Sequence, residues 1–208
     1  MAAPTHLLYL HGFRSSPLSF KAQRMGRWMA EHRPDIVWHC PQLPPSPAEA
    51  VAGLLDTIAR WGIDPSADLA ADLAIVGSSL GGFYATVLAA RLGCRFVVIN
   101  PAVEPARDLE KYIGEQTTWQ DPSEHFHFKA AFIPELQALR PATVSPVQRG
   151  LAIIAQGDEL LDWREMFARY EGAHIKLLEG SDHALSDFDD HLADILGFLD
   201  LTAAPDAA

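Results

Sequence analysis

The chain has 208 residues, of which 49% are hydrophobic and 21% charged. This composition is typical of a globular protein with a substantial core, and it excludes a disordered or fibrous chain. The formal net charge of −11 argues against nucleic acids and anionic membrane surfaces as partners, because an acidic surface repels both. We expect a single domain over residues 1–208, with a frayed tail at about 202–208.

The first residues and the cysteines indicate a cytoplasmic protein that does not insert into membranes. Residues 1–5 lack the basic segment of a signal peptide, and the apolar run 7–10 is too short for an export signal or a membrane span. Cys40 and Cys94 lie at or beside apolar runs, where buried free thiols are the usual state. Such cysteine usage fits a reducing compartment.

Short apolar runs alternate with segments of helical spacing along the chain. The runs are nearly continuous in Val, Ile and Leu, which is typical of parallel strands covered on both faces. Strands are predicted over residues 7–10, 36–39, 73–76, 96–99, 151–155 and 175–178. Helices are predicted over residues 18–31, 48–61, 80–92, 163–170 and 188–199. The alternation predicts an α/β fold, with a six-stranded, mainly parallel sheet and helices on both faces.

Residues 103–146 interrupt this alternation. They contain no clear strand, and proline and aromatic residues are frequent among them. A connection of this length inside a compact domain is usually functional. We expect a small, partly helical, lid-like insert over the carboxyl edge of the sheet; a surface excursion without a role is the alternative.

The segment Gly77-Ser-Ser79-Leu-Gly81 lies between a predicted strand and a predicted helix. A nucleophilic serine needs such a tight, strained turn to project its hydroxyl from the sheet, and glycines two residues away on each side avoid backbone collisions. The helix N-terminus that follows favours developing negative charge. Ser79 is therefore the predicted nucleophile. Ser78 is not centred between the glycines, and an ordinary glycine-rich turn is the alternative.

Two backbone N–H groups are candidates for an oxyanion hole, which stabilises the negatively charged oxygen of a tetrahedral intermediate. Leu80 follows the nucleophile, and Phe13 follows the first predicted strand, where Gly12 permits close backbone approach. We interpret His11 as a residue that shapes this loop rather than as a base or a metal ligand.

The last two predicted strands lead into candidates for the catalytic base and acid. His183 follows the final strand, and Asp158 and Asp162 follow the strand before it, so the chain order Ser, acid, His of this type of site is met. Asp162 begins Asp-Trp-Arg-Glu, which resembles the capping box of a helix. Asp158 is therefore favoured as the acid, with Asp162 as the second candidate.

Other candidate ligand sites are weaker. Aromatic side chains that could line an apolar acyl pocket, or belong to the ordinary core, are Phe13, Phe83, Tyr112 and Trp119. His125 and His127 have a spacing that would suit two metal ligands, but no third ligand is evident. We expect neither a metal nor another cofactor.

Several segments together resemble the YqiA/YcfP-like esterases of the α/β-hydrolase superfamily, and the YqiA-type most closely. The segments are residues 8–17, 41–45, 75–82, 100–103 and 156–162, and the surroundings of His183. The resemblance extends from about residue 7 to residue 199. Each motif alone is unspecific, but their ordered series is specific.

The resemblance implies a reduced α/β-hydrolase fold with the strand order 2-1-3-4-5-6 and the family's insert over residues 103–146. It implies a cytoplasmic esterase of acyl esters, with fatty acyl-CoA thioesters as further substrates, and the triad Ser79, Asp158 and His183. Glu104 departs from the basic residue expected after Asn-Pro-Ala-Val, which weighs against a preference for anionic CoA.

The residues thus predict a serine hydrolase that works through an acyl-enzyme on a small-molecule ester or thioester. A peptidase usually needs a wider cleft or an added domain, and an acyltransferase would require an acceptor alcohol or amine. A non-catalytic protein that binds an acyl ligand would usually lack one triad residue. The oligomeric state stays open.

Overall fold

The computed structural model describes residues 3–63 and 69–202. The part of the predicted frayed tail beyond residue 202 therefore lies outside the described residues. A six-stranded sheet forms its centre, and all neighbouring strands run parallel. In spatial order the strands are β2 (Val37–His39), β1 (His6–Leu10), β3 (Leu73–Ser78), β4 (Arg95–Ile99), β7 (Gly150–Ala155) and β8 (His174–Leu178). The predicted α/β class and the strand order implied by the resemblance are confirmed.

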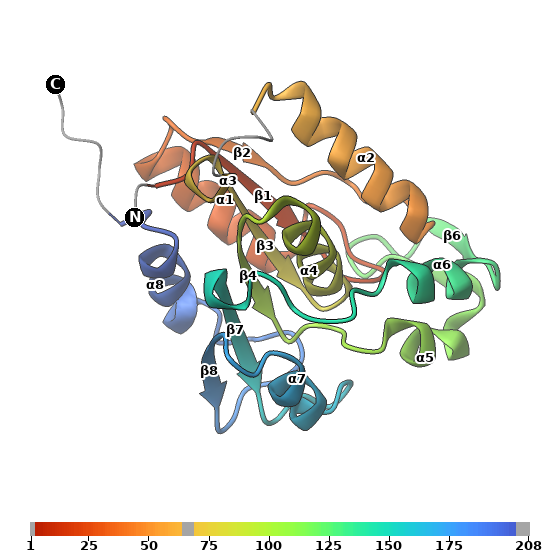
Figure 1. Cartoon of the computed structure of the whole chain (residues 1–208). Coiled ribbons are helices and arrows are strands. Elements are labelled where there is room, and N and C mark those ends of the chain that lie inside the picture. The colour runs from red at the N-terminus through yellow and green to blue at the C-terminus, as the bar shows by residue number, and fades with distance from the viewer. Residues whose placement is uncertain (1–2, 64–68, 203–208) are drawn as a thin grey trace, which may run out of the picture.

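Helices cover both faces of the sheet (Figure 1). On one face lie α1 (Phe20–His32) and α8 (Asp189–Phe198). On the other lie α2 (Pro47–Arg60), α4 (Leu80–Leu92) and α7 (Trp163–Arg169), while the short α3 (Leu69–Asp72) leads into β3. Alternate residues of β1 point into two separate buried clusters, Leu8 into one and Leu7 into the other. The inner strands β1, β3, β4 and β7 are largely continuous in apolar residues because both of their faces are buried, whereas the edge strands β2 and β8 are partly exposed.

Helix α4 lies in the middle of the molecule, against β1, β3, β4 and α2. All of its residues from Leu80 to Ala89 are buried. A helix that is apolar all round is stable only when it is enclosed in this way. The nucleophile candidate at its N-terminus is therefore attached to the most enclosed helix of the fold.

The segment between β4 and β7 combines short helices with a hairpin. Its elements are α5 (Pro105–Leu109), the 3₁₀ turn Glu110–Tyr112, β5 (Gly114–Thr117), β6 (His125–Phe128), α6 (Phe132–Leu139) and the 3₁₀ turn Val147–Arg149. The expectation that this insert holds no strand was wrong, because β5 and β6 pair antiparallel. Both strands are short, and β5 consists of Gly, Glu, Gln and Thr, so no apolar pattern marks it.

The insert is fastened to the body of the fold through α6. Glu135 on α6 accepts hydrogen bonds from the Ser46 hydroxyl, at 2.7 Å, and from the Ala48 N–H, at 3.0 Å. Both donors lie at the N-terminus of α2, where a carboxylate is favoured by the helix dipole. Figure 1 shows α5 and α6 side by side at the right of the molecule, next to the end of α2.

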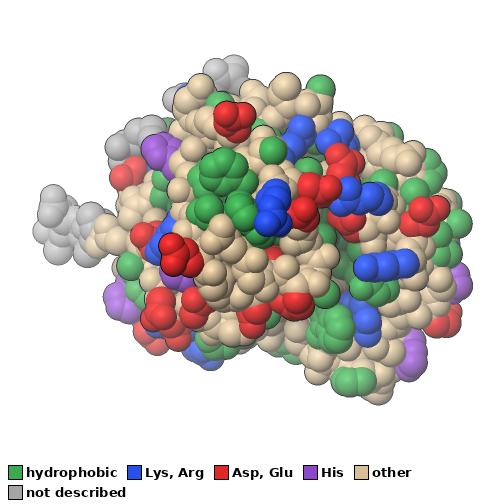
Figure 2. Space-filling model, turned by 90° about the horizontal axis from the view of Figure 1, so that it is seen from below, with side chains coloured by type: hydrophobic (Ala, Val, Ile, Leu, Met, Phe, Trp, Pro, Cys, Tyr) green, Lys and Arg blue, Asp and Glu red, His purple; other side chains and the backbone are tan. Residues whose placement is uncertain are grey.

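The remaining features are the surface charge, the two cysteines and the length of the helices. Figure 2 shows acidic side chains spread over one face of the molecule, several of them intermixed with Lys and Arg. Cys40 and Cys94 are free thiols, and burial raises the pKa of each to about 12, so both stay protonated at neutral pH. Among the helices that the structure describes, none has the length and apolar character required to cross a bilayer.

Candidate active site

Ser79 lies on a strained turn between β3 and α4. Its backbone angles are φ 55° and ψ −120°, a region that non-glycine residues rarely adopt. Glycine is required on both sides of it: a Cβ at Gly77 would lie 2.2 Å from the Gly81 carbonyl oxygen, and one at Gly81 would lie 2.0 Å from the Leu10 oxygen. The backbone collisions expected from the sequence are therefore found in the structure.

Three side chains from separate strand ends form a continuous chain of hydrogen bonds at the carboxyl edge of the sheet. His183 Nε2 lies 3.0 Å from Ser79 Oγ, and His183 Nδ1 lies 2.7 Å from Asp158 Oδ2. The other oxygen of the fully buried Asp158 accepts the N–H groups of Leu160, at 2.9 Å, and Leu161, at 2.8 Å. The carboxylate therefore holds the proton on Nδ1, which leaves Nε2 to accept the Ser79 hydroxyl.

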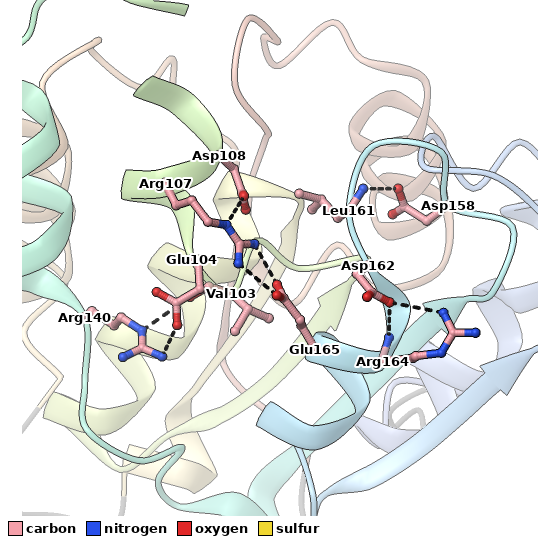
Figure 3. A network of polar contacts seen from close by, with 10 residues as sticks. All are labelled: Val103, Glu104, Arg107, Asp108, Arg140, Asp158, Leu161, Asp162, Arg164 and Glu165. Carbon is pink, nitrogen blue, oxygen red and sulfur yellow. Dashed lines mark hydrogen bonds and ion pairs between the residues drawn. The ribbon is translucent and has the colours of Figure 1, made fainter. Parts of the chain in front are cut away.

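The second acid candidate, Asp162, has a structural role. It is the N-cap of α7 and accepts the Arg164 N–H at 2.9 Å, as the resemblance to a capping box predicted. Glu165 does not complete that box. Its carboxylate instead accepts from the two terminal guanidinium nitrogens of Arg107 on α5, at 2.7 and 2.8 Å. Figure 3 shows Asp162 directed at Arg164, and Asp158 separately held by Leu161.

A fully buried asparagine, Asn100, connects the loop of His183 to the sheet. Its Oδ1 accepts the Ala155 N–H at 2.8 Å, and its Nδ2 donates to the carbonyl oxygens of Asp182, at 2.9 Å, and His183, at 3.1 Å. Sequence reasoning assigned it no role. The available signal was an Asn directly after a strand, since Asn tolerates the positive φ of 41° found here.

Ser79 and His183 line a cavity of about 740 Å³. Three predicted pocket residues line it, Phe13, Tyr112 and Trp119, and Trp119 is 63% exposed. Phe83, on α4, is only 3% exposed and packs in the core, and it lines neither this cavity nor the smaller one beside it. Lys21 also lines the cavity, where burial lowers its pKa to about 8 while the charge of Asp182 acts in the opposite sense.

The loop after β1 comes very close to the nucleophile. A Cβ at Gly12 would lie 3.1 Å from Ser79 Cβ, so only glycine fits there without displacing a neighbour. His11 Nε2 accepts the Leu43 N–H at 3.1 Å, and its Nδ1 therefore donates to the Gly12 oxygen at 3.0 Å. The peptide between Gly12 and Phe13 is trans, so the Phe13 N–H points away from that oxygen.

His11 must be neutral for this arrangement, which gives stability a dependence on pH. Burial lowers its pKa from the usual 6.5, so its contribution is complete above pH 6.5 and is lost as the pH falls toward the folded-state value. We expect the free energy of unfolding of wild type to fall more steeply from pH 6.5 downward than that of His11→Gln, by up to about 1.4 kcal/mol per pH unit. Urea unfolding at each pH measures it, and parallel curves would contradict it.

The histidines considered for a metal site lie on the hairpin. His127 Nδ1 is 2.8 Å from Glu115 Oε1 across the two strands, and both side chains are largely exposed. Within the described parts of the chain, no three His, Cys, Asp or Glu side chains gather into a group able to hold a metal ion.

Solved structures with the same architecture include several hydrolases. Alpha/beta hydrolase domain-containing protein 10 from mouse has a TM-score of 0.65 at 16% identity, over 98% of this chain and 93% of that one. Est1E from Butyrivibrio proteoclasticus, bound to ferulic acid, has a TM-score of 0.67 at 14% identity, over 94% of this chain and 87% of that one. A structure from LipS and LipT, two metagenome-derived lipolytic enzymes, has a TM-score of 0.66 at 16% identity, over 96% of this chain and 95% of that one. These likenesses confirm the α/β-hydrolase fold.

The sequence also matches one family model over nearly its whole length. The match covers residues 6–200, from the first strand to the end of the last helix, and so includes Ser79, Asp158 and His183. The chain belongs to the family described as "Uncharacterised protein family (UPF0227)", the YqiA-like family whose motifs the sequence resembles.

Proposed function

We propose that this protein is a serine esterase that hydrolyses small apolar acyl esters through Ser79, His183 and Asp158. The observation that carries the proposal is the hydrogen-bonded chain from Ser79 Oγ through His183 to Asp158, which opens onto the 740 Å³ cavity. Similarity in fold to the esterase domain of a Rhodothermus marinus protein and to a metagenome-derived lipolytic enzyme supports it.

In the first half of the reaction Ser79 becomes acylated. His183 Nε2 takes the hydroxyl proton as Oγ attacks the ester carbonyl carbon, and Asp158 stabilises the imidazolium that forms. The N–H groups of Leu80 and Phe13 donate to the oxyanion of the tetrahedral intermediate. His183 then returns the proton to the leaving alcohol, and the acyl group stays on Ser79.

The second half releases the acid. A water molecule enters the place of the alcohol, gives its proton to His183 and attacks the acyl-enzyme through a second tetrahedral intermediate. Collapse of this intermediate returns the proton to Ser79 Oγ. No step requires a metal or an organic cofactor, since side chains supply the nucleophile and the base, and backbone N–H groups supply the oxyanion donors.

The cavity wall favours an apolar acyl group. Phe13 contacts the rings of Tyr112, Phe126 and Phe128, with centroids 5.1 to 5.9 Å apart, and Phe13 and Tyr112 face the cavity. The volume lies within the range of pockets that enclose small organic ligands. Glu104 stands where the resemblance leads us to expect a basic residue. It is a carboxylate paired with Arg140, so this position offers no cation to a CoA phosphate.

Turnover of p-nitrophenyl esters and acyl-CoAs of graded chain length tests the proposal. We expect hydrolysis of the esters, a burst of p-nitrophenol equal to the enzyme concentration where deacylation is slow, and Ser79 carrying the acyl group in mass spectra. Binding of the acyl ligand without turnover would favour the non-catalytic alternative. A product that forms only with an added alcohol or amine would favour an acyltransferase.

Substitution of the two aspartates tests the assignment of the acid. Asp158→Asn removes the negative charge that orients His183, and we expect kcat to fall by about 10⁴-fold, the cost of losing the correct imidazole tautomer. Asp162→Asn is the matched control: it keeps an N-cap side chain on α7 and should leave kcat within about 2-fold of wild type. Initial rates of the purified variants measure both. A larger loss for Asp162→Asn would reverse the assignment, and equal losses would contradict it.

A further inference from the structure

Arg14 fastens the insert hairpin to the loop that follows β1. Its Nε donates to the Thr117 carbonyl oxygen at 2.7 Å, and its terminal nitrogen donates to Thr117 Oγ1 at 3.0 Å. The guanidinium carbon lies 4.1 Å from the centre of the Trp119 ring, in a cation–π contact. The backbone N–H of Trp119 in turn donates to the Arg14 carbonyl oxygen at 2.7 Å. Both the side chain and the main chain of Arg14 are therefore bound to residues 117–119.

The neighbouring residue is bound to the same insert. The Phe13 ring lies against Tyr112, Phe126 and Phe128, which come from the 3₁₀ turn and from β6. Two successive residues of the loop are thus held from the insert side. Gly12 is held from the other side, since its oxygen accepts from His11 Nδ1, at 3.0 Å, and from the Ser15 N–H, at 3.3 Å.

These contacts converge on one peptide group. The Phe13 N–H and the Gly12 carbonyl belong to the same peptide group. His11 and Ser15 hold its carbonyl oxygen, and the contacts of Phe13 and Arg14 with the insert hold the chain on the N–H side. Arg14 itself has a φ of 59°, so the chain turns sharply directly after the proposed oxyanion donor. A turn that non-glycine residues rarely adopt persists when surrounding contacts hold it.

We propose that Arg14 is a positioning residue, which latches the β5–β6 hairpin to this loop and thereby holds the Phe13 N–H where the oxyanion forms. The inference rests on the proposed esterase function. It assigns the hairpin a part in the rate of the chemical step. Arg14 touches no reacting atom in this scheme and acts through the backbone of Phe13.

The variants are chosen to keep the backbone comparable. Arg14→Gln and Arg14→Lys retain a Cβ at the positive φ. They therefore change the contacts with Thr117 and Trp119 without relieving the strained turn. Thr117→Val removes the hydroxyl acceptor, and Thr117→Ser retains it. The control is Arg60→Gln, which removes an arginine bonded to Asp56 and Thr57 on the outer face of α2.

We expect Arg14→Gln to lower kcat by about 10- to 100-fold with KM within about 3-fold, because a displaced oxyanion donor keeps only part of an effect of 10² to 10³. Thr117→Val should lower kcat by about 3-fold or more, whereas Thr117→Ser and Arg60→Gln should match wild type. The inhibition constant of butylboronic acid, which forms a tetrahedral adduct on the serine, should rise in parallel with the loss of kcat.

Three results would overturn the proposal. Variants of Arg14 with a lower melting temperature but unchanged kcat and boronate inhibition would show a structural role only. A rise in KM confined to anionic substrates would make Arg14 a substrate-binding residue. A wild-type enzyme that neither turns over esters nor forms the boronate adduct would overturn the esterase function itself, and this inference with it. If wild type hydrolyses esters and the Arg14 variants lose kcat, that loss cannot be due to a failure of the esterase function.

Discussion

Ser79→Ala is expected to lower kcat for p-nitrophenyl esters by about 10⁴-fold or more while the protein stays folded. The substitution removes the nucleophile and one hydrogen bond, that to His183 Nε2. It leaves a Cβ at the strained turn, so the backbone of the turn is unchanged. Its effect on the free energy of unfolding should therefore stay below about 1 kcal/mol. Steady-state kinetics and urea unfolding of the purified variant measure the two quantities.

Ser78→Ala is the matched control for this prediction. Ser78 is the last residue of β3 and also lines the cavity, but the triad hydrogen bond is made by its neighbour. We expect Ser78→Ala to keep kcat within about 10-fold of wild type, since it leaves the nucleophile and base in place. If Ser79→Ala retained wild-type kcat, the mechanism would be wrong for these substrates, and activity lost only with Ser78→Ala would move the nucleophile by one residue.

Asn100→Ala is expected to affect both stability and catalysis. It leaves the Ala155 N–H and the carbonyl oxygens of Asp182 and His183 without their buried partner, and it places alanine at a φ of 41°. We expect the free energy of unfolding to fall by about 2 to 4 kcal/mol, from unsatisfied buried groups and backbone strain. Because the loop of His183 loses its anchor, kcat should fall by the order of 10²-fold, as for a catalytic group displaced by about 1 Å.

Thr86→Val separates these two effects. The Thr86 hydroxyl is buried and bonds the Gly82 oxygen, at 2.9 Å, and the Tyr170 hydroxyl, at 2.7 Å, and neither Thr86 nor Tyr170 lines the cavity. Its loss should destabilise the protein by about 1 to 3 kcal/mol and leave kcat near wild type below the melting temperature. Were Asn100→Ala destabilised with an unchanged kcat, Asn100 would have no part in placing His183.

Several features could be predicted from the sequence because they depend on short-range physics. Continuous apolar runs between helical segments indicated a doubly covered parallel sheet, and the strands and their long helices lie within a few residues of the predicted bounds. The glycine before Ser79 was interpretable because its Cβ would collide with Gly81 and Gly82, only four and five positions along the chain, whereas that of Gly81 would collide with the end of the adjacent strand at Leu10. The cap at Asp162 is equally local, since its partner is two residues along the chain.

The burial of single side chains was harder to predict. Phe83 was expected near an acyl group, yet it lies in the core, because α4 is apolar on every face and its periodicity cannot mark which side meets a cavity. The hairpin carried only a weak signal: β5 has no apolar residue, and β6 alternates His and Phe over only four residues. The two strands are stabilised by pairing with each other and by Arg14.

The sequence by itself determined the order of strands and helices, the strained turn at Ser79 and the placement of candidate acids and bases at one edge of the sheet. These follow from periodicity and from contacts between near neighbours in the chain. Only the tertiary structure decided that Asp158 rather than Asp162 meets His183, that Asn100 anchors the loop of His183, and that Arg14 joins the hairpin to the loop of Phe13. Those contacts join residues 25 to 103 positions apart, and a distance of that kind is set by packing, which no local pattern records.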